Sequence, residues 1–400
     1  MLKKFGFPIL FAALAAYLLY YAYSHRSVSA FVWATSFILL AWVVLTAFLR
    51  SVLVSIVSIT VTLAIVEAAL GYLPQLMAKK TEGSNAPTAY FDSNFSYSTP
   101  AYWQLGPFGS QPKPGVFESR KLASDGSVVY TATYTIGPDG FRETPQYGWT
   151  PQNILTSVRP RINFLGDSFT FGEGLNDRQT MEYFFGSLSE KQGQAVWVKN
   201  YGVHGWGMHQ ALAILQSDLD TRANIQFALT SPWHASRSAC ADFYSLGSPK
   251  YILQGDGLVK RNGYCRSFGW VEHSPKVIRG LITSSKIFNL IIDCLFVTSD
   301  QDQQIQLYLG ILKTMQENLA QKGQKFILGF VKADQSWFVG TYNNDKLLAA
   351  IKSIGIEVKD MTLAGTNEAL DKKYYIHELD KHPSPAGNEA RAQSLLQLIK

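Results

Sequence analysis

Three short segments contain residue types that could together carry out nucleophilic chemistry. The segment GDS ends at Ser168, NYGVHGWG begins at Asn200, and DKHP contains Asp380 and His382. A serine hydroxyl is a weak nucleophile unless a neighbouring base removes its proton. His382 could act as that base, and Asp380 could orient the imidazole and stabilise its charged form. These residue types therefore suggest a Ser–His–Asp site.

The hydrophobic pattern places these segments at the ends of predicted strands. Strands are predicted at 162–165, 195–201, 225–230, 326–331 and 356–361, and helices at 178–192, 208–219, 303–321, 344–353 and 385–399. Alternating strands and helices of this length predict a parallel sheet covered on both faces. Functional groups in such sheets gather beyond the carboxyl ends of the strands. We therefore expect all three segments at one edge of an α/β fold.

Each segment also has an ordinary structural interpretation. A single GDS is more often a turn than a nucleophile, and Asp-x-His before proline is more often the lead-in to a helix. The chain has seven histidines, and any one of them would normally be structural. The combination of Ser168, Asp380 and His382, each on a loop of the predicted sheet, favours a catalytic site.

The three segments resemble blocks of the SGNH (GDSL-like) hydrolases. FLGDSFTFGEG is similar to the first block of that family, NYGVHGWG to the second and DKHPSPAGNEARA to the fifth. The resemblance extends from about residue 160 to the C-terminus. It implies a flavodoxin-like three-layer parallel sheet, the SGNH hydrolase fold, and a reaction that needs neither a metal nor an organic cofactor.

The resemblance also implies roles for individual residues. Ser168 would be the nucleophile, His382 the base and Asp380 its partner. The backbone N–H groups of Ser168 and Gly205 would bind the oxyanion, and Asn200 would be an oxyanion or substrate-binding residue.

One part of the family pattern is missing. The third block usually supplies an asparagine to the oxyanion hole, but the strand at 225–230 runs into SPWHASRSAC, which has none. Losing one oxyanion donor commonly costs about 10²–10³ in turnover. His234 could donate from a ring nitrogen, or Arg237 could approach instead. Either residue could equally be structural.

The N-terminal region predicts membrane attachment. Three apolar runs, at 5–23, 28–49 and 52–73, are each near the roughly 20 residues that a helix needs to cross a bilayer. The links between them are short, so a two-span or re-entrant arrangement is also open. The positive charges do not decide the orientation. With Lys3 and Lys4 inside, three spans would place the C-terminal part outside, which is the arrangement we favour.

The sequence divides into three predicted parts. These are transmembrane helices at 1–76, a linker and small β-rich segment at 77–155, and the hydrolase-like domain at 156–400 with an insertion near 231–300. Residues 77–112 are predicted to form an irregular linker or a proline-punctuated edge segment. A β-hairpin that includes a strand at 128–136 is predicted to follow, with turn residues on both sides of that strand.

Charge and cysteine content exclude some functions and partners. The net charge is +6, but no basic run carries interleaved aromatics, so we expect no nucleic-acid partner. The three cysteines lack the spacing of a zinc site. In an oxidising compartment Cys240 and Cys265 could form a disulfide, leaving Cys294 as a buried apolar residue.

Together these features predict a membrane-anchored serine esterase. Its substrate would be an O-acyl ester, with O-acetyl favoured, on an envelope glycan or glycolipid, and its surroundings would include membrane lipids. An O-acyltransferase using the same triad is a second possibility. A non-catalytic glycan-binding or assembly module is a third; the missing asparagine favours it, and the intact Ser168, Asp380 and His382 oppose it.

Overall fold

The computed structural model describes most of the chain after residue 102 and shorter stretches before it. The described residues are 13–20, 32–39, 42–43, 52–55, 57–66, 95–97, 103–123, 125–148, 158–241, 245, 247–265, 285, 287, 300–333, 343–363, 373–378 and 380–399. The chain forms two compact units, Met1–Ser84 with Ser285–Ile287, and Asn85–Ser284 with Phe288–Lys400.

The described part of the first unit is helical. Its helical residues, at 13–20, 32–39, 42–43, 52–55 and 57–66, fall within the three apolar runs, and the rest of those runs lies outside the described residues. Within the described residues, none of the helices has both the length and the apolar character needed to span a membrane.

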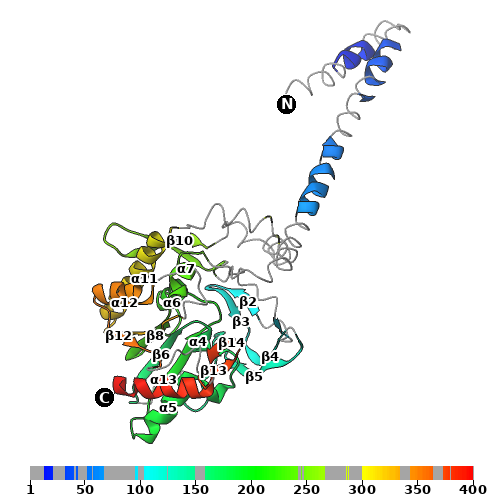
Figure 1. The fold of residues 1–400 in the computed structure, drawn as a ribbon. Helices are drawn as coiled ribbons and strands as arrows, with labels where there is room; N and C mark the ends of the chain where they lie inside the picture. Colours follow the sequence, from blue (N-terminus) through cyan, green and yellow to red (C-terminus); the bar gives the residue numbers. More distant parts are fainter. Residues whose placement is uncertain are drawn as a thin grey trace. The chain divides into compact units, whose positions relative to one another are not determined.

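The second unit is built on a five-stranded parallel sheet (Figure 1). In spatial order its strands are β12 (Val358–Asp360), β11 (Lys325–Phe330), β8 (Ile225–Thr230), β6 (Arg161–Gly166) and β7 (Trp197–Gly202). The order reverses at β6, where the chain first pairs with β7 and then continues on the other side with β8. The predicted flavodoxin-like parallel sheet is confirmed.

Helices cover both faces of this sheet, which explains why its inner strands are apolar almost throughout. Helices α5 (Met181–Lys191) and α13 (Pro385–Leu395) pack together on one face. Helices α6 (Met208–Leu215), α11 (Gln301–Gln321) and α12 (Asn344–Ser353) cover the other. Adjacent residues of β8 point to opposite faces of the sheet. Phe227 packs in the core under α5 and α13, and Ala228 packs in the core under α6 and α11.

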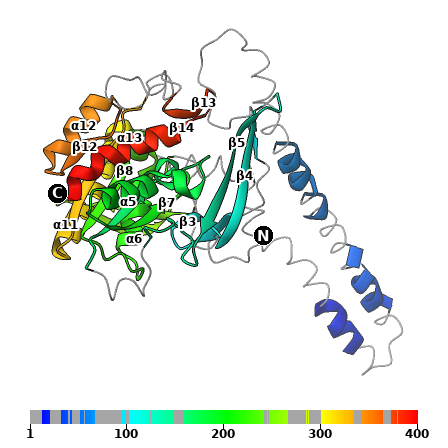
Figure 2. The ribbon, with the colours of Figure 1, turned by 90° about the horizontal axis from the view of Figure 1, so that it is seen from below.

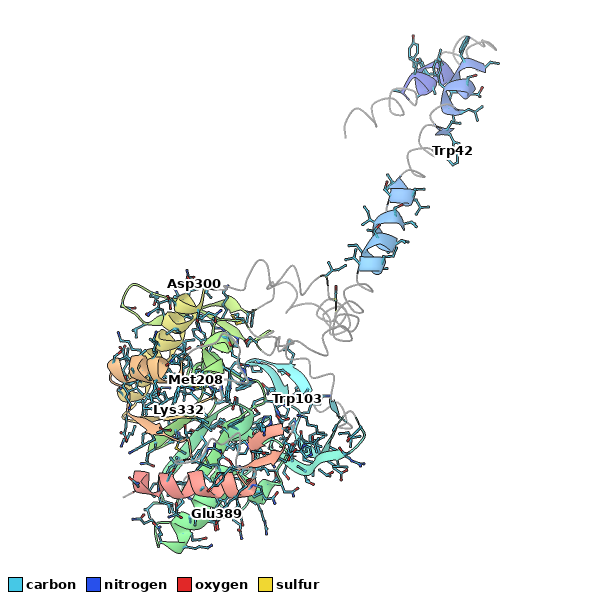
Figure 3. The ribbon with its side chains drawn as sticks, in the orientation of Figure 1. Trp42, Trp103, Met208, Asp300, Lys332 and Glu389 are labelled. Atoms are coloured by element: carbon cyan, nitrogen blue, oxygen red, sulfur yellow. A yellow bond between two sulfur atoms is a disulfide. The ribbon has the colours of Figure 1, made fainter. Side chains whose placement is uncertain are left out.

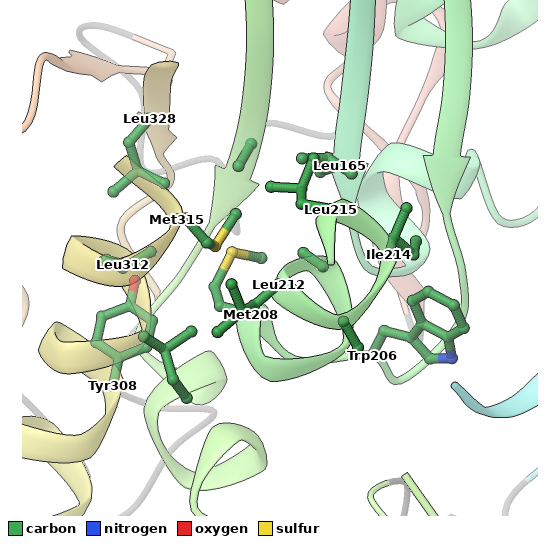
Figure 4. Packing of buried hydrophobic residues seen from close by; sticks show 14 of the residues in the cluster. Leu165, Trp206, Met208, Leu212, Ile214, Leu215, Tyr308, Leu312, Met315 and Leu328 are labelled. Atoms are coloured by element: carbon green, nitrogen blue, oxygen red, sulfur yellow. The ribbon is translucent and has the colours of Figure 1, made fainter. Parts of the chain in front are cut away.

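The core beneath α6 and α11 is closely packed around the end of the sheet. Met208 and Leu212 of α6 meet Leu312 and Met315 of α11, and Trp206 lies at the start of α6 (Figure 4). All five side chains are almost completely buried. Burial of this kind stabilises the fold by roughly 1.5–3 kcal/mol per large apolar side chain, and it fixes the loop between β7 and α6.

Small differences from the predicted boundaries have local causes. Helix α6 ends at Leu215, four residues earlier than predicted, and β12 is shorter than predicted. Helix α5 begins only at Met181, because Thr180 caps it by accepting from Tyr183 N; a short 3-10 turn, Asp177–Gln179, precedes it.

The β-rich segment contains the predicted hairpin and more strands than predicted. Strands β4 (Gly115–Ala123) and β5 (Val128–Ile136) pair antiparallel as a long hairpin (Figure 2). Of the two interpretations of residues 77–112, the irregular linker is wrong over the last part, which forms β1 (Phe95–Tyr97), β2 (Trp103–Gly106) and β3 (Gly109–Pro112). The sequence GPFG supplies a two-residue turn between β2 and β3, with Gly109 at a φ of 101° that favours glycine.

The insertion after β8 contains a short helix and a second hairpin among its described residues. These are α7 (Trp233–Ser238), β9 (Pro249–Leu253) and β10 (Val259–Tyr264). Cys240 and Cys265 form a disulfide between the end of α7 and the end of β10, which confirms the predicted pairing. Cys294 lies outside the described residues.

Candidate active site

Ser168 lies where β6 turns into the short helix α4 (Ser168–Phe171). Asp167 caps α4 through its side chain, which accepts from Phe169 N at 3.0 Å. The neighbouring strand must end in glycine, because a Cβ at Gly202 would lie 2.3 Å from Phe171 N. Strand β7 can therefore pass directly under α4, and Ser168 is held at the carboxyl edge of the sheet.

The predicted base and its partner come from β14 (Asp380–Pro383), which pairs with β13 (Tyr375–His377). His382 Nε2 lies 2.8 Å from Ser168 Oγ, and His382 Nδ1 lies 2.5 Å from Asp380 Oδ1. The backbone N–H of His382 also donates to Asp380 Oδ1, at 3.0 Å. With Nδ1–H donated to the carboxylate, Nε2 is free to accept the serine proton. The structure thus brings Ser168, His382 and Asp380 into one hydrogen-bonded chain.

A lysine from the β-rich segment completes the surroundings of Asp380. Lys121, on β4, donates from Nζ to Asp380 Oδ2 at 2.8 Å, and both side chains are buried. Burial raises the pKa of the Asp380 carboxyl, but His382 and Lys121 outweigh this effect and hold the pKa well below its usual value. Sequence reasoning missed Lys121, whose partner lies 259 residues away. The one signal was its place in β4, where alternation puts it on the same side as the buried Ser119.

A second carboxylate, that of Glu173, also reaches the imidazole of His382. Glu173 Oε2 lies 3.3 Å from His382 Nε2 and forms an ion pair with His204 Nδ1, while Tyr130 OH donates to Oε1 at 3.2 Å. The Glu173 side chain is buried, although a glutamate is ordinarily exposed. The segment FGEG was the available signal. Gly174 has a φ of 77°, and a Cβ there would meet Ile376 Cδ1 at 2.4 Å, so the backbone can turn Glu173 inward.

The two carboxylates and the imidazole shift one another's pKa. Burial lowers the pKa of His382, but Glu173 and Asp380 more than offset it and raise the pKa to about 9. Burial raises the pKa of Glu173, but the nearby His204 and His382 lower it to about 2. The charged imidazole is therefore the favoured form at neutral pH.

The residues predicted to bind the oxyanion differ in whether their donor groups are already hydrogen-bonded. Gly205 lies in the turn after β7 with a φ of 71°. Within the described residues, neither its N–H nor that of Ser168 has a hydrogen-bond acceptor, so both are available to a ligand. The Asn200 side chain instead donates to Thr170 O and accepts from Gly202 N, each at 2.8 Å. Asn200 thus fastens the turn and does not present its amide to a substrate.

His234 lies behind Ser168 and braces Asp167. Its Nε2 is 3.0 Å from Asp167 Oδ2, and its Nδ1 is 2.9 Å from Thr230 Oγ1. Trp233 Nε1 and Arg237 Nη1 also donate to Asp167 Oδ2, at 2.7 and 2.9 Å. Burial raises the pKa of Asp167, but His234 and Arg237 lower it further than burial raises it. The structure thus places Nε2 of His234 against Asp167 and Nδ1 against Thr230, and neither contact is with Ser168 Oγ.

Arg142 joins the β-rich segment to the loop that follows Ser168 and α4. Its buried guanidinium donates to the carbonyl oxygens of Phe171, Gly172 and Leu175 at 2.8, 2.7 and 2.5 Å, and it forms an ion pair with Asp177. Carbonyls at the end of α4 that lack helical partners are thereby satisfied. The guanidinium holds the loop that carries the second carboxylate.

The site has three donor groups close enough for a metal ion to be considered. Glu173, Asp380 and His382 offer ligand atoms within 4.8 Å of one another. Both nitrogens of His382, however, are engaged with Asp380 and Ser168. A metal there would have to break these bonds, and the donor set fits proton transfer better than metal coordination.

Comparison with known proteins finds similarity among solved structures alone. No protein-family model matches the chain, and no curated protein matches it significantly. The solved structures that match include a lipolytic protein of the G-D-S-L family from Veillonella parvula DSM 2008, with 12% identity and a TM-score of 0.34 over 60% of this chain and 97% of that one. A lipase from a goat rumen metagenome matches with 15% identity and a TM-score of 0.33 over 59% and 95%. An alpha/beta hydrolase enzyme from the metagenome of Lake Arreo matches with 12% identity and a TM-score of 0.33 over 60% and 94%. At this distance the activity has to be derived from the site itself.

Proposed function

We propose that the chain is a serine hydrolase that cleaves ester bonds. The observation that carries this proposal is the contact of His382 Nε2 with Ser168 Oγ, at 2.8 Å, while Nδ1 is held by Asp380. Ser168 Oγ attacks the ester carbonyl carbon as its proton passes to His382 Nε2. The N–H groups of Ser168 and Gly205 stabilise the charge on the carbonyl oxygen.

The second half of the reaction regenerates the serine. His382 gives its proton to the departing alcohol as the C–O bond of the ester breaks, leaving an acyl group on Ser168 Oγ. A water molecule then attacks this acyl group and passes a proton to His382, which returns it to Ser168 as the free acid leaves. If a sugar hydroxyl replaced this water, the same site would act as an acyltransferase.

The proposal extends to attachment at a membrane. In the first unit, large apolar side chains such as Trp33, Trp42 and Leu53 are more than 60% exposed (Trp42 is labelled in Figure 3). Apolar surface of this kind marks membrane or partner contact. Extraction of membranes with alkaline carbonate should leave the chain in the pellet, and detergent should release it. Release by carbonate alone would contradict the anchor.

We further propose that this domain lies outside the cytoplasm. Its proposed substrate is an acylated glycan or glycolipid, with acetyl as the favoured acyl group. The disulfide between Cys240 and Cys265 supports an oxidising compartment. A purified O-acetylated envelope glycan should release acetate in the presence of the protein. Transfer of acetyl to an added acceptor glycan, without free acetate, would identify the acyltransferase instead.

Labelling of Ser168 by a fluorophosphonate tests the serine hydrolase directly. The wild type should be labelled, whereas Ser168→Ala and His382→Ala should not. Ser189→Ala removes a buried serine whose hydroxyl donates to Phe185 O, and it should be labelled like the wild type. A wild-type protein that resists labelling at every pH would contradict the proposal and favour a non-catalytic glycan-binding module.

A further inference from the structure

His382 has a carboxylate facing each of its ring nitrogens. Asp380 Oδ1 lies 2.5 Å from Nδ1, as a triad requires. Glu173 Oε2 lies 3.3 Å from Nε2, the nitrogen that also contacts Ser168 Oγ. A Ser–His–Asp triad needs only the first carboxylate. The second shares Nε2 with the nucleophile, so the two groups compete for the same proton.

The position of Glu173 is held from several directions. Its backbone N–H donates to Ser168 O at 3.0 Å, which ties it to the nucleophile itself. Tyr130 OH from β5 and His204 Nδ1 from the loop after β7 hold its carboxylate. A buried carboxylate with this many partners stays charged and stays in place.

The charged groups around His382 favour its protonated form. Asp380 reaches it from β14 and Glu173 from the loop after α4, while Lys121, on β4, is the nearby cation that opposes them. His204 acts on the site through Glu173. Lys381 points elsewhere, over the ring of Tyr375. The two carboxylates that face the ring outweigh the opposing effect of Lys121 on His382.

We infer that Glu173 is a positioning residue that holds the Nε2 proton of charged His382, so that Ser168 becomes activated only when this proton has left. The inference rests on the proposed function. It has two consequences of opposite sign. Glu173 reduces the amount of neutral base at neutral pH, yet it stabilises the imidazolium that forms each time Ser168 attacks.

The pH dependence of fluorophosphonate labelling separates these consequences. In the wild type the labelling rate should rise with pH to a plateau at alkaline pH. In Glu173→Gln the midpoint of the rise should move down by about 1–3 pH units, the usual effect of one close opposite charge. Its alkaline plateau should also fall, because the imidazolium has lost a partner. A purely structural role would lower the rate without moving the midpoint.

Glu118→Gln is the matched control, since it removes the same charge from an exposed position on β4. Its midpoint should equal that of the wild type. A midpoint in Glu173→Gln that also equals the wild-type value would overturn the inference while leaving the serine hydrolase intact. A wild type that is never labelled contradicts the proposed function instead.

Titration of His382 by nuclear magnetic resonance tests the inference without any reaction. The full-length protein would carry ¹⁵N-histidine, and the His382 signal would be identified by its loss in His382→Ala. We expect the wild-type signal to titrate well above the ordinary histidine value of about 6.5, and that of Glu173→Gln to titrate lower. If Glu173→Gln does not fold, a wild-type midpoint near the ordinary value still overturns the inference.

Discussion

In the described part of the chain, two Asp–His–hydroxyl arrangements meet at the adjacent residues Asp167 and Ser168. One joins Asp380, His382 and Ser168, and the other joins Asp167, His234 and Thr230. A cation contacts each aspartate, Lys121 in the first and Arg237 in the second. The residue types match, and in both arrangements the imidazole lies within 3.0 Å of its carboxylate and of its hydroxyl, so these contacts alone do not distinguish a reactive site from a structural support.

The difference lies in what remains available. The His382 side chain is 20% exposed and that of His234 only 1%. The Thr230 hydroxyl is also bonded to Tyr308 OH, at 2.7 Å, deep in the core. Among the described residues, Ser168 Oγ has His382 as its one hydrogen-bond partner. We expect such an arrangement to be reactive only when its hydroxyl oxygen has a lone pair that is not hydrogen-bonded and is accessible to the substrate.

The largest expected effect comes from removing the two hydroxyls in turn. Ser168→Ala should lower ester turnover by about 10⁴-fold or more, as loss of a nucleophile does in triad enzymes. Thr230→Val, which keeps the shape of the side chain, should change turnover by less than about tenfold and chiefly lower the melting temperature. Comparable losses of turnover in both variants would erase the distinction between the two arrangements.

The aspartates should separate activity from stability. Asp380→Asn favours the wrong tautomer of His382 and should lower turnover by about 10³–10⁴-fold. Asp167→Asn leaves Arg237 with a weakened buried partner and should cost roughly 3–5 kcal/mol of unfolding free energy. Denaturant unfolding and steady-state kinetics on both variants check this. A larger loss of activity in Asp167→Asn than in Asp380→Asn would contradict the assignment of Asp380 to activity and Asp167 to stability.

Changing the pH should move activity and stability in opposite directions. The pKa of His382 is raised to about 9, so the neutral fraction of its imidazole increases almost tenfold per pH unit well below that value, and turnover should rise by about 50-fold from pH 7 to 9. The charged form stabilises the fold fully below the unfolded pKa of about 6.5, and this contribution, at most about 3 kcal/mol, is lost as pH rises through 9. A turnover that is flat above pH 7 would contradict this assignment.

Reduction of the disulfide should produce the smallest effect on chemistry. The bond between Cys240 and Cys265 closes the insertion beside α7, the helix that carries the residues bracing Asp167. Its loss should lower the free energy of unfolding by about 3 kcal/mol and leave the pH profile unchanged. Cys240→Ser with Cys265→Ser, compared with the oxidised wild type, checks both quantities. A shifted profile would mean that the brace also tunes His382.

Much of the sheet and the triad could be predicted from the sequence, because the signals were local. Strand and helix periods set the sheet, and Asp380 and His382 are neighbours in one extended segment. The partners of Glu173 and Lys121 come from distant segments, so no local pattern reports them. Asn200 has a side chain that could bind an oxyanion, but in the structure its amide oxygen accepts from the backbone N–H of Gly202.

His234 shows the same difficulty in another form. Its position directly after β8 made it a reasonable oxyanion donor, yet the direction of its ring depends on Asp167 and Thr230 together. The short helix α7, which was not predicted, turns the ring toward these residues. Side-chain direction at the end of a strand follows from tertiary packing, which a single sequence does not report.

The anchoring of Arg142 has a consequence for any attempt to transplant this chemistry. The guanidinium fastens a turn that precedes the sheet in the chain to the carbonyls beyond the nucleophile. A parallel sheet that received only the Ser168 and His382 loops would therefore lack Arg142, which holds the loop that carries Glu173. The transplanted unit would also have to include the β4–β5 hairpin and the turn after it, and this hairpin carries Lys121, the partner of Asp380.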